Sequence, residues 1–274
     1  MSADGDSDRA RFGLVVFGVV VLVALAWAGA TTSAAYDPYN PGDDGTSELR
    51  QQVESDPAVE YTSADGYDAL EPEGTVAITV PSAADEADAA TAAAFVRDGG
   101  TLVVTDESPE ANAFLEAVGA EARLDGEVLR DERDYYRGPT MPVATGVEDH
   151  ALTADVDRLG FSHATAIEPY GATVLATTSD ATYLVDGPDA TPGEDATPSA
   201  YPVATVEDVG DGTVVLVGDS AFATNELLEN EDNVRFLANG YAEADRVAVV
   251  SSAADEPPLA ALHSAVIDRL TSVL

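Results

Sequence analysis

The segment TVVLVGDSAFATN, residues 213–225, combines the residue types of a reactive site with the pattern of a buried strand. Gly-Asp-Ser carries the nucleophilic serine in one class of esterases, which makes Ser220 a candidate nucleophile. Such a serine needs a general base that an acid orients. The only later histidine, His263, is preceded at the required spacing by Ala260 and not by an aspartate. The sequence therefore favours the other interpretation, in which Asp219 or Ser220 caps the helix that follows the strand.

A second apolar run, TLVVT, ends in Asp106 in the same way that TVVLVG ends in Asp219. In an open parallel sheet, ligands bind at the carboxyl ends of the strands. We therefore take Asp106, Asp219, Ser220 and Asn225 as candidate ligand-binding or interface residues, and we expect no catalytic residue.

Metal and thiol chemistry have little support in the sequence. Cysteine is absent, which excludes disulfides, thiolate metal sites and cysteine nucleophiles. The three histidines, His150, His163 and His263, share no short metal-ligand spacing, so we expect neither a metal site nor a cofactor.

The formal net charge is -39 at pH 7, and all 12 basic residues are arginines. This charge argues against nucleic-acid binding, which needs clustered cations. It also disfavours docking on an anionic membrane surface. Such a chain repels itself unless salt screens the charges, and at ~1 M salt the Debye length is about 3 Å. The composition is typical of salt-adapted, halophilic proteins; the alternative is an acidic surface that binds cations or a basic partner.

Four of the arginines lie together in ARLDGEVLRDERDYYRG, where acidic residues separate them. One interpretation is an anion-binding patch with the neighbouring tyrosines. The other, which we prefer, is local ion pairing at the surface. The arginines are Arg123, Arg130, Arg133 and Arg137.

Residues 12–30, FGLVVFGVVVLVALAWAGA, contain no charged side chain. A helix of this length spans about 28 Å, close to the hydrocarbon thickness of a bilayer, so we predict a transmembrane helix. Arg9 and Arg11 precede it, which predicts a cytoplasmic N-terminus and a main domain outside the cell membrane. A cleaved signal peptide is the competing interpretation, because AGA and SAA offer small-residue cleavage sites.

The rest of the chain must position the candidate residues. Apolar runs such as TVAITV and TLVVTD alternate with helical patterns that end in glycine, which indicates βαβ units and an α/β fold with a parallel sheet. ATVLATTS and ATYLVD read as further strands of a possible hairpin, and Gly210-Asp211-Gly212 marks a tight turn between two others. The predicted segments are an N-terminal tail (1–11), the transmembrane helix (12–30), a linker (31–45), the α/β domain (46–250) and a C-terminal amphipathic helix (251–274).

Four segments carry a resemblance to a known family: YNPGDDGTSELR, GGTLVVTDES, VVLVGDSAFATN and EDNVRFLANG. In this order and spacing, from about Tyr39 to Gly240, the chain resembles the family called domain of unknown function 4350. The resemblance implies a single-span membrane protein with a flavodoxin-like fold, similar to the class I glutamine amidotransferases. Those amidotransferases use a cysteine nucleophile, which this chain lacks, so the resemblance argues against glutaminase activity.

Members of that family occur in gene neighbourhoods with MoxR-type ATPases and von Willebrand-type proteins, and related domains occur in gliding-motility and transporter-associated proteins. The resemblance thus implies an accessory role in an envelope complex with protein partners. We therefore expect a non-enzymatic, membrane-anchored binding or scaffold domain. The alternatives are a domain that senses a solute or cation at the strand ends, and a serine hydrolase that uses Ser220 with His163 or His263.

Overall fold

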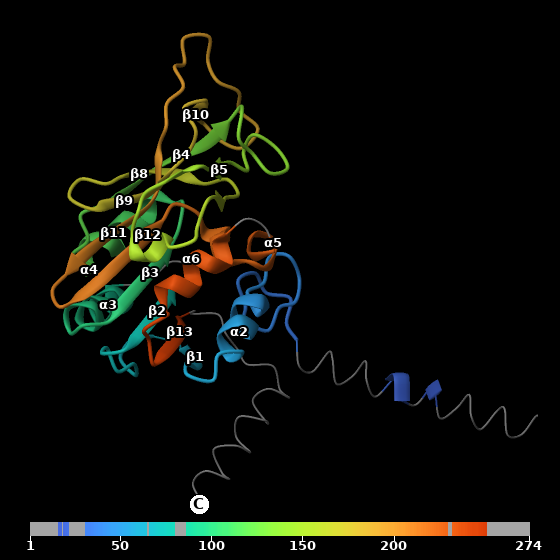
Figure 1. Cartoon of the computed structure of the whole chain (residues 1–274), viewed down its shortest axis with the longest axis vertical. Coiled ribbons are helices and arrows are strands. Elements are labelled where there is room, and N and C mark those ends of the chain that lie inside the picture. The colour runs from blue at the N-terminus through green and yellow to red at the C-terminus, as the bar shows by residue number, and fades with distance from the viewer. Residues whose placement is uncertain are drawn as a thin grey trace, which may run out of the picture.

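The computed structural model describes residues 16–17, 19–21, 31–64, 66–79, 86–229 and 232–250, and a large mixed sheet forms its centre (Figure 1). The sheet has eight strands, in the order β1 (Glu60–Ala64), β13 (Arg246–Val250), β2 (Thr75–Thr79), β3 (Thr101–Thr105), β12 (Gly212–Val217), β11 (Pro202–Val209), β9 (Thr173–Thr177) and β6 (Gly146–Val147). The first five strands in this order, which end with β12, pair in parallel. The last three, β11, β9 and β6, each pair antiparallel with their neighbours.

The prediction of a flavodoxin-like, amidotransferase-like parallel sheet is therefore wrong. The apolar runs on which the prediction rested do form strands. A run of apolar residues shows that a strand is buried, but it does not show whether the strand is parallel or antiparallel to its neighbours. The turn Gly210-Asp211 between β11 and β12 is too short for a parallel crossover, so it fixes an antiparallel pair. Gly210 has a φ of 65°, which suits the tight turn.

Two smaller antiparallel sheets lie beside the large one. The three-stranded sheet has the order β10 (Thr182–Val185), β4 (Arg123–Asp131), β8 (Thr165–Glu168), and the two-stranded sheet pairs β5 (Val143–Ala144) with β7 (Leu159–Gly160). The hairpin considered for ATVLATTS and ATYLVD does not form. β9 belongs to the large sheet and β10 pairs with β4, so the two strands lie in different sheets.

Helices cover both faces of the large sheet, and each face has its own core. Alternate residues of β3 and β12 point to opposite sides, as the strand pleat requires. Val103 and Val215 pack with Phe222 and Phe236 on one face, and Leu102 joins α3 and α4 on the other. The helices are α2 (Ser47–Glu54), α3 (Glu86–Arg97), η1 (Pro109–Ala111), α4 (Asn112–Val118), η2 (Ala151–Thr153), η3 (Ser220–Ala223), α5 (Asn225–Leu228) and α6 (Asn233–Gly240).

Gly119 ends α4 in the left-handed conformation, with a φ of 104°, and its N–H is bonded to the carbonyls of Leu115 and Glu116. We expect Gly119→Ala to lower the free energy of unfolding by about 1–2 kcal/mol, because a Cβ disfavours this conformation and would lie 3.2 Å from Val209 Cγ1. Urea titration in high salt measures the change. The exposed Gly193, where a Cβ meets nothing within 4 Å, is the control, and an equal loss there would contradict the explanation.

Within the described residues, no helix is long and apolar enough to cross a membrane. This finding contradicts the predicted transmembrane helix at 12–30, and with it the single-pass localisation inferred from Arg9 and Arg11. Of that segment, the structure describes residues 16–17 and 19–21. The tail 1–11 and the helix predicted for 251–274 lie outside the described residues.

The segment 31–45, which we expected to be a linker, is held against the domain by its backbone. Tyr36 N–H donates to the carbonyl of Asp44, and Thr46 N–H donates to that of Asp37. The carbonyl of Gly45 in turn accepts from the N–H of Asn225. The segment is therefore folded as part of the α/β domain.

Candidate functional site

The adjacent parallel strands β3 and β12 end beside each other, and the chain leaves them toward opposite faces of the sheet. After β3 it enters α4, whose Phe114 and Leu115 belong to one core. After β12 it enters η3 and later α6, whose Phe222 and Phe236 belong to the other. In open α/β sheets, ligands bind where the chain reverses in this way, at the carboxyl ends of the two strands.

The structure brings Asp106 and Asp219 to this place, at the ends of β3 and β12. Thr105 pairs with Val217, and the next N–H, that of Asp106, donates to the carbonyl of Val217 at 3.0 Å. Asp219 is completely buried. Its carboxylate accepts from the N–H of Ser162 at 2.5 Å and from the N–H of Ala221 at 2.8 Å. Asp219 is thus the N-cap of η3, as the sequence favoured.

Ser220 takes part in a hydrogen-bond chain that reaches the N-terminal segment. Its hydroxyl lies 3.0 Å from the Tyr36 hydroxyl, and its N–H donates to the Glu107 carboxylate at 2.8 Å. Tyr36 has a φ of 61°, an uncommon conformation for a tyrosine, which the surrounding backbone hydrogen bonds maintain. Ser220 therefore joins two segments that are far apart in the sequence.

The carboxylates of this cluster hold protons more tightly than free side chains do. Burial, assisted by the charges of Glu107 and Glu110, raises the pKa of Asp106 to about 6. Burial also raises the pKa of Asp219 to about 8, although the N–H groups of Ser162 and Ala221 oppose the shift. The cause is the cost of placing an ionised carboxylate away from water.

Tyr36 responds to the same environment. Burial raises the pKa of its hydroxyl, the hydrogen bond with Ser220 opposes the rise, and the charges of Glu107, Asp219 and Asp106 increase it. The phenol therefore remains protonated at neutral pH, where it can donate a hydrogen bond but has little capacity to act as a base.

Asn225 has a different role from the other predicted residues. Its side-chain oxygen accepts from Glu48 N–H at 2.9 Å, and its amide group donates to the carbonyls of Asn40 (3.1 Å) and Gly42 (2.7 Å). The side chain is 5% exposed. It connects the turn of YNPGDDGTSELR to the segment that follows η3.

A second buried side-chain amide, that of Asn233, connects the segment EDNVRFLANG to the rest of the domain. Asn233 is fully buried, accepts from Gly160 N–H at 2.8 Å and donates to the carbonyl of Gly160 at 2.9 Å. The motifs that carried the family resemblance are thus joined to each other and to the 159–162 segment by internal hydrogen bonds. Their residue types serve the packing of loops over the sheet.

Neither of the two described histidines forms a hydrogen bond with Ser220. The ring nitrogen of His163 lies 3.2 Å from the Ser162 hydroxyl, and His150 accepts from Leu152 N–H as the cap of η2. His263 lies outside the described residues. In the part of the chain that the structure describes, no group of three or more His, Cys, Asp or Glu side chains is placed to hold a metal ion.

The arginines of 123–137 are bonded within the chain, but only some of the ion pairs are local, as we preferred from the sequence, whereas Asp180 and Glu226 are distant along the chain. Arg123 donates to the carbonyls of Ala120 and Ala122, and Arg130 pairs with Glu132. Arg133 pairs with Asp134 and Asp180, and Arg137 with Glu226. These interactions account for the cluster without a bound anion.

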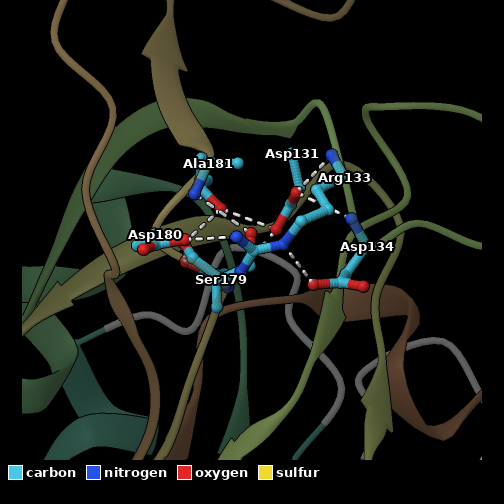
Figure 2. A network of polar contacts seen from close by, with 8 residues as sticks. Asp131, Arg133, Asp134, Ser179, Asp180 and Ala181 are labelled. Carbon is cyan, nitrogen blue, oxygen red and sulfur yellow. Dashed lines mark hydrogen bonds and ion pairs between the residues drawn. The ribbon is translucent and has the colours of Figure 1, made fainter.

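Arg133 flanks the most densely bonded carboxylate of this region, Asp131 (Figure 2). Asp131 is fully buried, and its oxygens accept from the N–H groups of Arg133 and Asp134 and from the Thr182 hydroxyl at 2.8–2.9 Å. Burial opposes its ionisation, but hydrogen bonds from Ser179, the two N–H groups and Thr182 together lower its pKa. The network fixes the turn before β10 to the end of β4.

Two hollows lie away from the strand-end cluster. One, of about 420 Å³, is lined by His150, Glu121 and Glu207 among others. The other, of about 400 Å³, lies at the amino ends of β2 and β3 and is lined by Thr75 and Thr101 among others. Neither is lined by Asp106, Asp219, Ser220 or Asn225.

Sequence reasoning missed Tyr36, Glu107 and Ser162, which complete the cluster around Asp219 and Ser220. Glu107 directly follows Asp106, so extending the strand end by one residue would have included it. Tyr36 and Ser162 are far from Ser220 in the sequence, and no local pattern marks them.

The fold and this cluster define an α/β domain with a mixed sheet, in which the chain's own side chains join the loops at the ends of β3 and β12. The chain belongs to the family described as domain of unknown function 4350, which matches residues 38–240. No curated protein matches the sequence.

One solved structure supports the corrected fold. The chain is similar to the structure described as "mmIFT52 N-terminal domain", with a TM-score of 0.52 and 12% identity over 72% of this chain and 88% of that one. Cytoplasmic protein STM1381 from Salmonella typhimurium LT2 is 12% identical over 73% of this chain and 87% of that one, with a TM-score of 0.49. The likeness to the mmIFT52 N-terminal domain agrees with the mixed sheet and not with the amidotransferase-like sheet expected from the resemblance. At this identity the likeness concerns the fold alone.

Proposed function

We propose that this chain is a non-enzymatic binding or scaffold domain, an accessory subunit of a protein complex. The observation that carries the proposal is that the polar side chains after β12 are already hydrogen-bonded within the chain. Both oxygens of Asp219 accept backbone N–H groups, and the Ser220 hydroxyl is bonded to Tyr36. The groups that could do chemistry are used to hold loops together.

The protonation states support this proposal. A serine nucleophile needs a partner that takes its proton. The partner of Ser220 is Tyr36, and burial together with nearby carboxylates raises the pKa of that phenol. A protonated phenol at neutral pH is a poor general base, which favours a structural role for the pair.

The family resemblance suggests the kind of complex. MoxR-type ATPases and von Willebrand-type proteins are the candidate partners, because their genes neighbour those of family members. The formal charge of -39 adds a physical condition, since a partner must tolerate or complement a strongly acidic surface.

We expect Ser220→Ala to leave partner capture unchanged and to lower the free energy of unfolding by about 0.5–1.5 kcal/mol, through loss of the bond to Tyr36. The measurement is a pull-down with the purified full chain in high salt, beside urea titration. A serine-reactive probe serves as the control. Labelling of the native chain that disappears in Ser220→Ala would sink the non-enzymatic proposal in favour of a hydrolase.

A further inference from the structure

The chain contains a duplicated tetrapeptide on a loop that extends away from the strands. Asp-Ala-Thr-Pro occurs at 189–192 and again at 195–198. Both copies belong to the projecting loop, residues 186–199, which lies between β10 and β11 and extends beyond the sheets (Figure 1). The two copies flank Gly193 and Glu194, and Ala196 N–H closes the turn on the carbonyl of Gly193 at 3.0 Å.

The side chains of this loop are not used by the fold. None of residues 186–199 is buried, and Thr191 and Thr197 are both exposed. Within the described residues, no side chain of 186–198 forms a hydrogen bond or ion pair. Packing and stability therefore do not explain why the same four residues stand on both limbs of the loop.

The base of the loop, in contrast, is firmly held. Thr182, at the start of β10, donates to the buried Asp131 carboxylate, and its carbonyl accepts from Ser199 N–H at 2.9 Å. Ser179 and Asp180 are bonded to the same network around Asp131 and Arg133 (Figure 2). The loop thus has a hydrogen-bonded base and a repeated sequence whose side chains the fold does not use. This combination favours a role of the repeated side chains in binding another molecule.

We propose that the projecting loop is the partner-binding element of this chain and that its ligand is a protein with a groove lined by cations and aromatic side chains. This inference rests on the proposed function. Each copy offers an aspartate for an arginine or lysine, two small side chains that permit close approach, and a proline. Proline restricts the free loop, which lowers the entropy lost on binding, and suits aromatic-lined grooves.

The charge of the loop argues against a second copy of this chain as the occupant. Residues 186–199 contain Asp186, Asp189, Glu194 and Asp195 and no basic residue. A second copy would bring a formal charge of -39 to this loop, so like charges would oppose the contact. The partner must instead supply positive groups.

The test uses the full chain with a photoreactive benzoylphenylalanine in place of the exposed Gly193, where an added Cβ would meet nothing within 4 Å. The control position is Asp211, exposed in the turn at the far end of β11. After irradiation in native extract, we expect an adduct with one other protein from position 193 and none from position 211. A peptide of residues 186–199 should compete, and a scrambled peptide of equal composition should not.

The variant that removes both copies, Asp189→Ala, Thr191→Ala, Asp195→Ala and Thr197→Ala together, should reduce the adduct at least ten-fold and leave the thermal unfolding midpoint unchanged. An adduct that survives in this variant, or one whose mass is that of a dimer of this chain, would overturn the inference. Capture of a partner by the full chain through another face would overturn it while leaving the proposed function intact. Absence of any partner in pull-downs of the unmodified chain would instead refute the proposed function.

Discussion

Replacing Asn225 with alanine is expected to lower the free energy of unfolding by about 3–5 kcal/mol. The substitution leaves Glu48 N–H and the carbonyls of Asn40 and Gly42 without their partners. Because Asn225 is 5% exposed, water cannot readily replace the lost bonds.

Asn239→Ala is the matched control for this experiment. The Asn239 amide donates to the carbonyls of Leu152 and Ala154, but the side chain is partly exposed, so a loss of about 1 kcal/mol is expected. Urea titrations in high salt give both values. Equal losses in the two variants would show that Asn225 does not connect the N-terminal turn to the domain in the way that the hydrogen bonds indicate.

The second large effect is a dependence of stability on pH. Asp219 has a pKa of about 8 in the folded chain, against the ordinary value of 3.8. Between these two values the folded state binds more protons than the unfolded state, so the free energy of unfolding falls as the pH rises from about 4 to about 8. The limiting slope for one proton is about 1.4 kcal/mol per pH unit. Asp106 acts in the same direction up to its pKa of about 6.

Two variants separate these contributions. Asp219→Asn is neutral at every pH and should flatten the slope between pH 6 and 8. At pH 5 it should cost about 1–3 kcal/mol, because its amide N–H₂ cannot accept from the N–H of Ser162 or Ala221. Asp106→Asn should reduce the dependence of the free energy of unfolding on pH only below about pH 6. A native chain whose stability stays level or rises from pH 5 to 8 would contradict the assignment of the buried proton.

These effects bear on the proposed function because they concern the parts of the chain that a catalytic site would occupy. The Asp219 carboxyl holds η3 and the 159–162 segment in place, and Asn225 holds the N-terminal turn. We therefore expect substitutions here to act first on stability. Substitutions in the projecting loop should act on binding and leave stability unchanged.

The local elements of this fold were predictable from the sequence, because their causes are local. TVAITV and TLVVTD became β2 and β3, since runs of β-branched residues suit buried strands. Ser108 caps η1, and Gly119 ends α4 in a conformation that glycine adopts without strain. The absence of cysteine and the capping role of Asp219 were likewise visible in the residues alone.

The sheet direction and the strand-end cluster depended on the tertiary structure. A buried strand has the same composition whether its neighbour is parallel or antiparallel, so the residues did not reveal that β9 and β10 belong to different sheets. The bond between Tyr36 and Ser220 spans 184 positions in the sequence. Sequence patterns thus determined which apolar runs form buried strands and where glycine ends a helix. Which buried polar groups meet was decided only by packing, because their hydrogen bonds join segments that are close in space and distant along the chain.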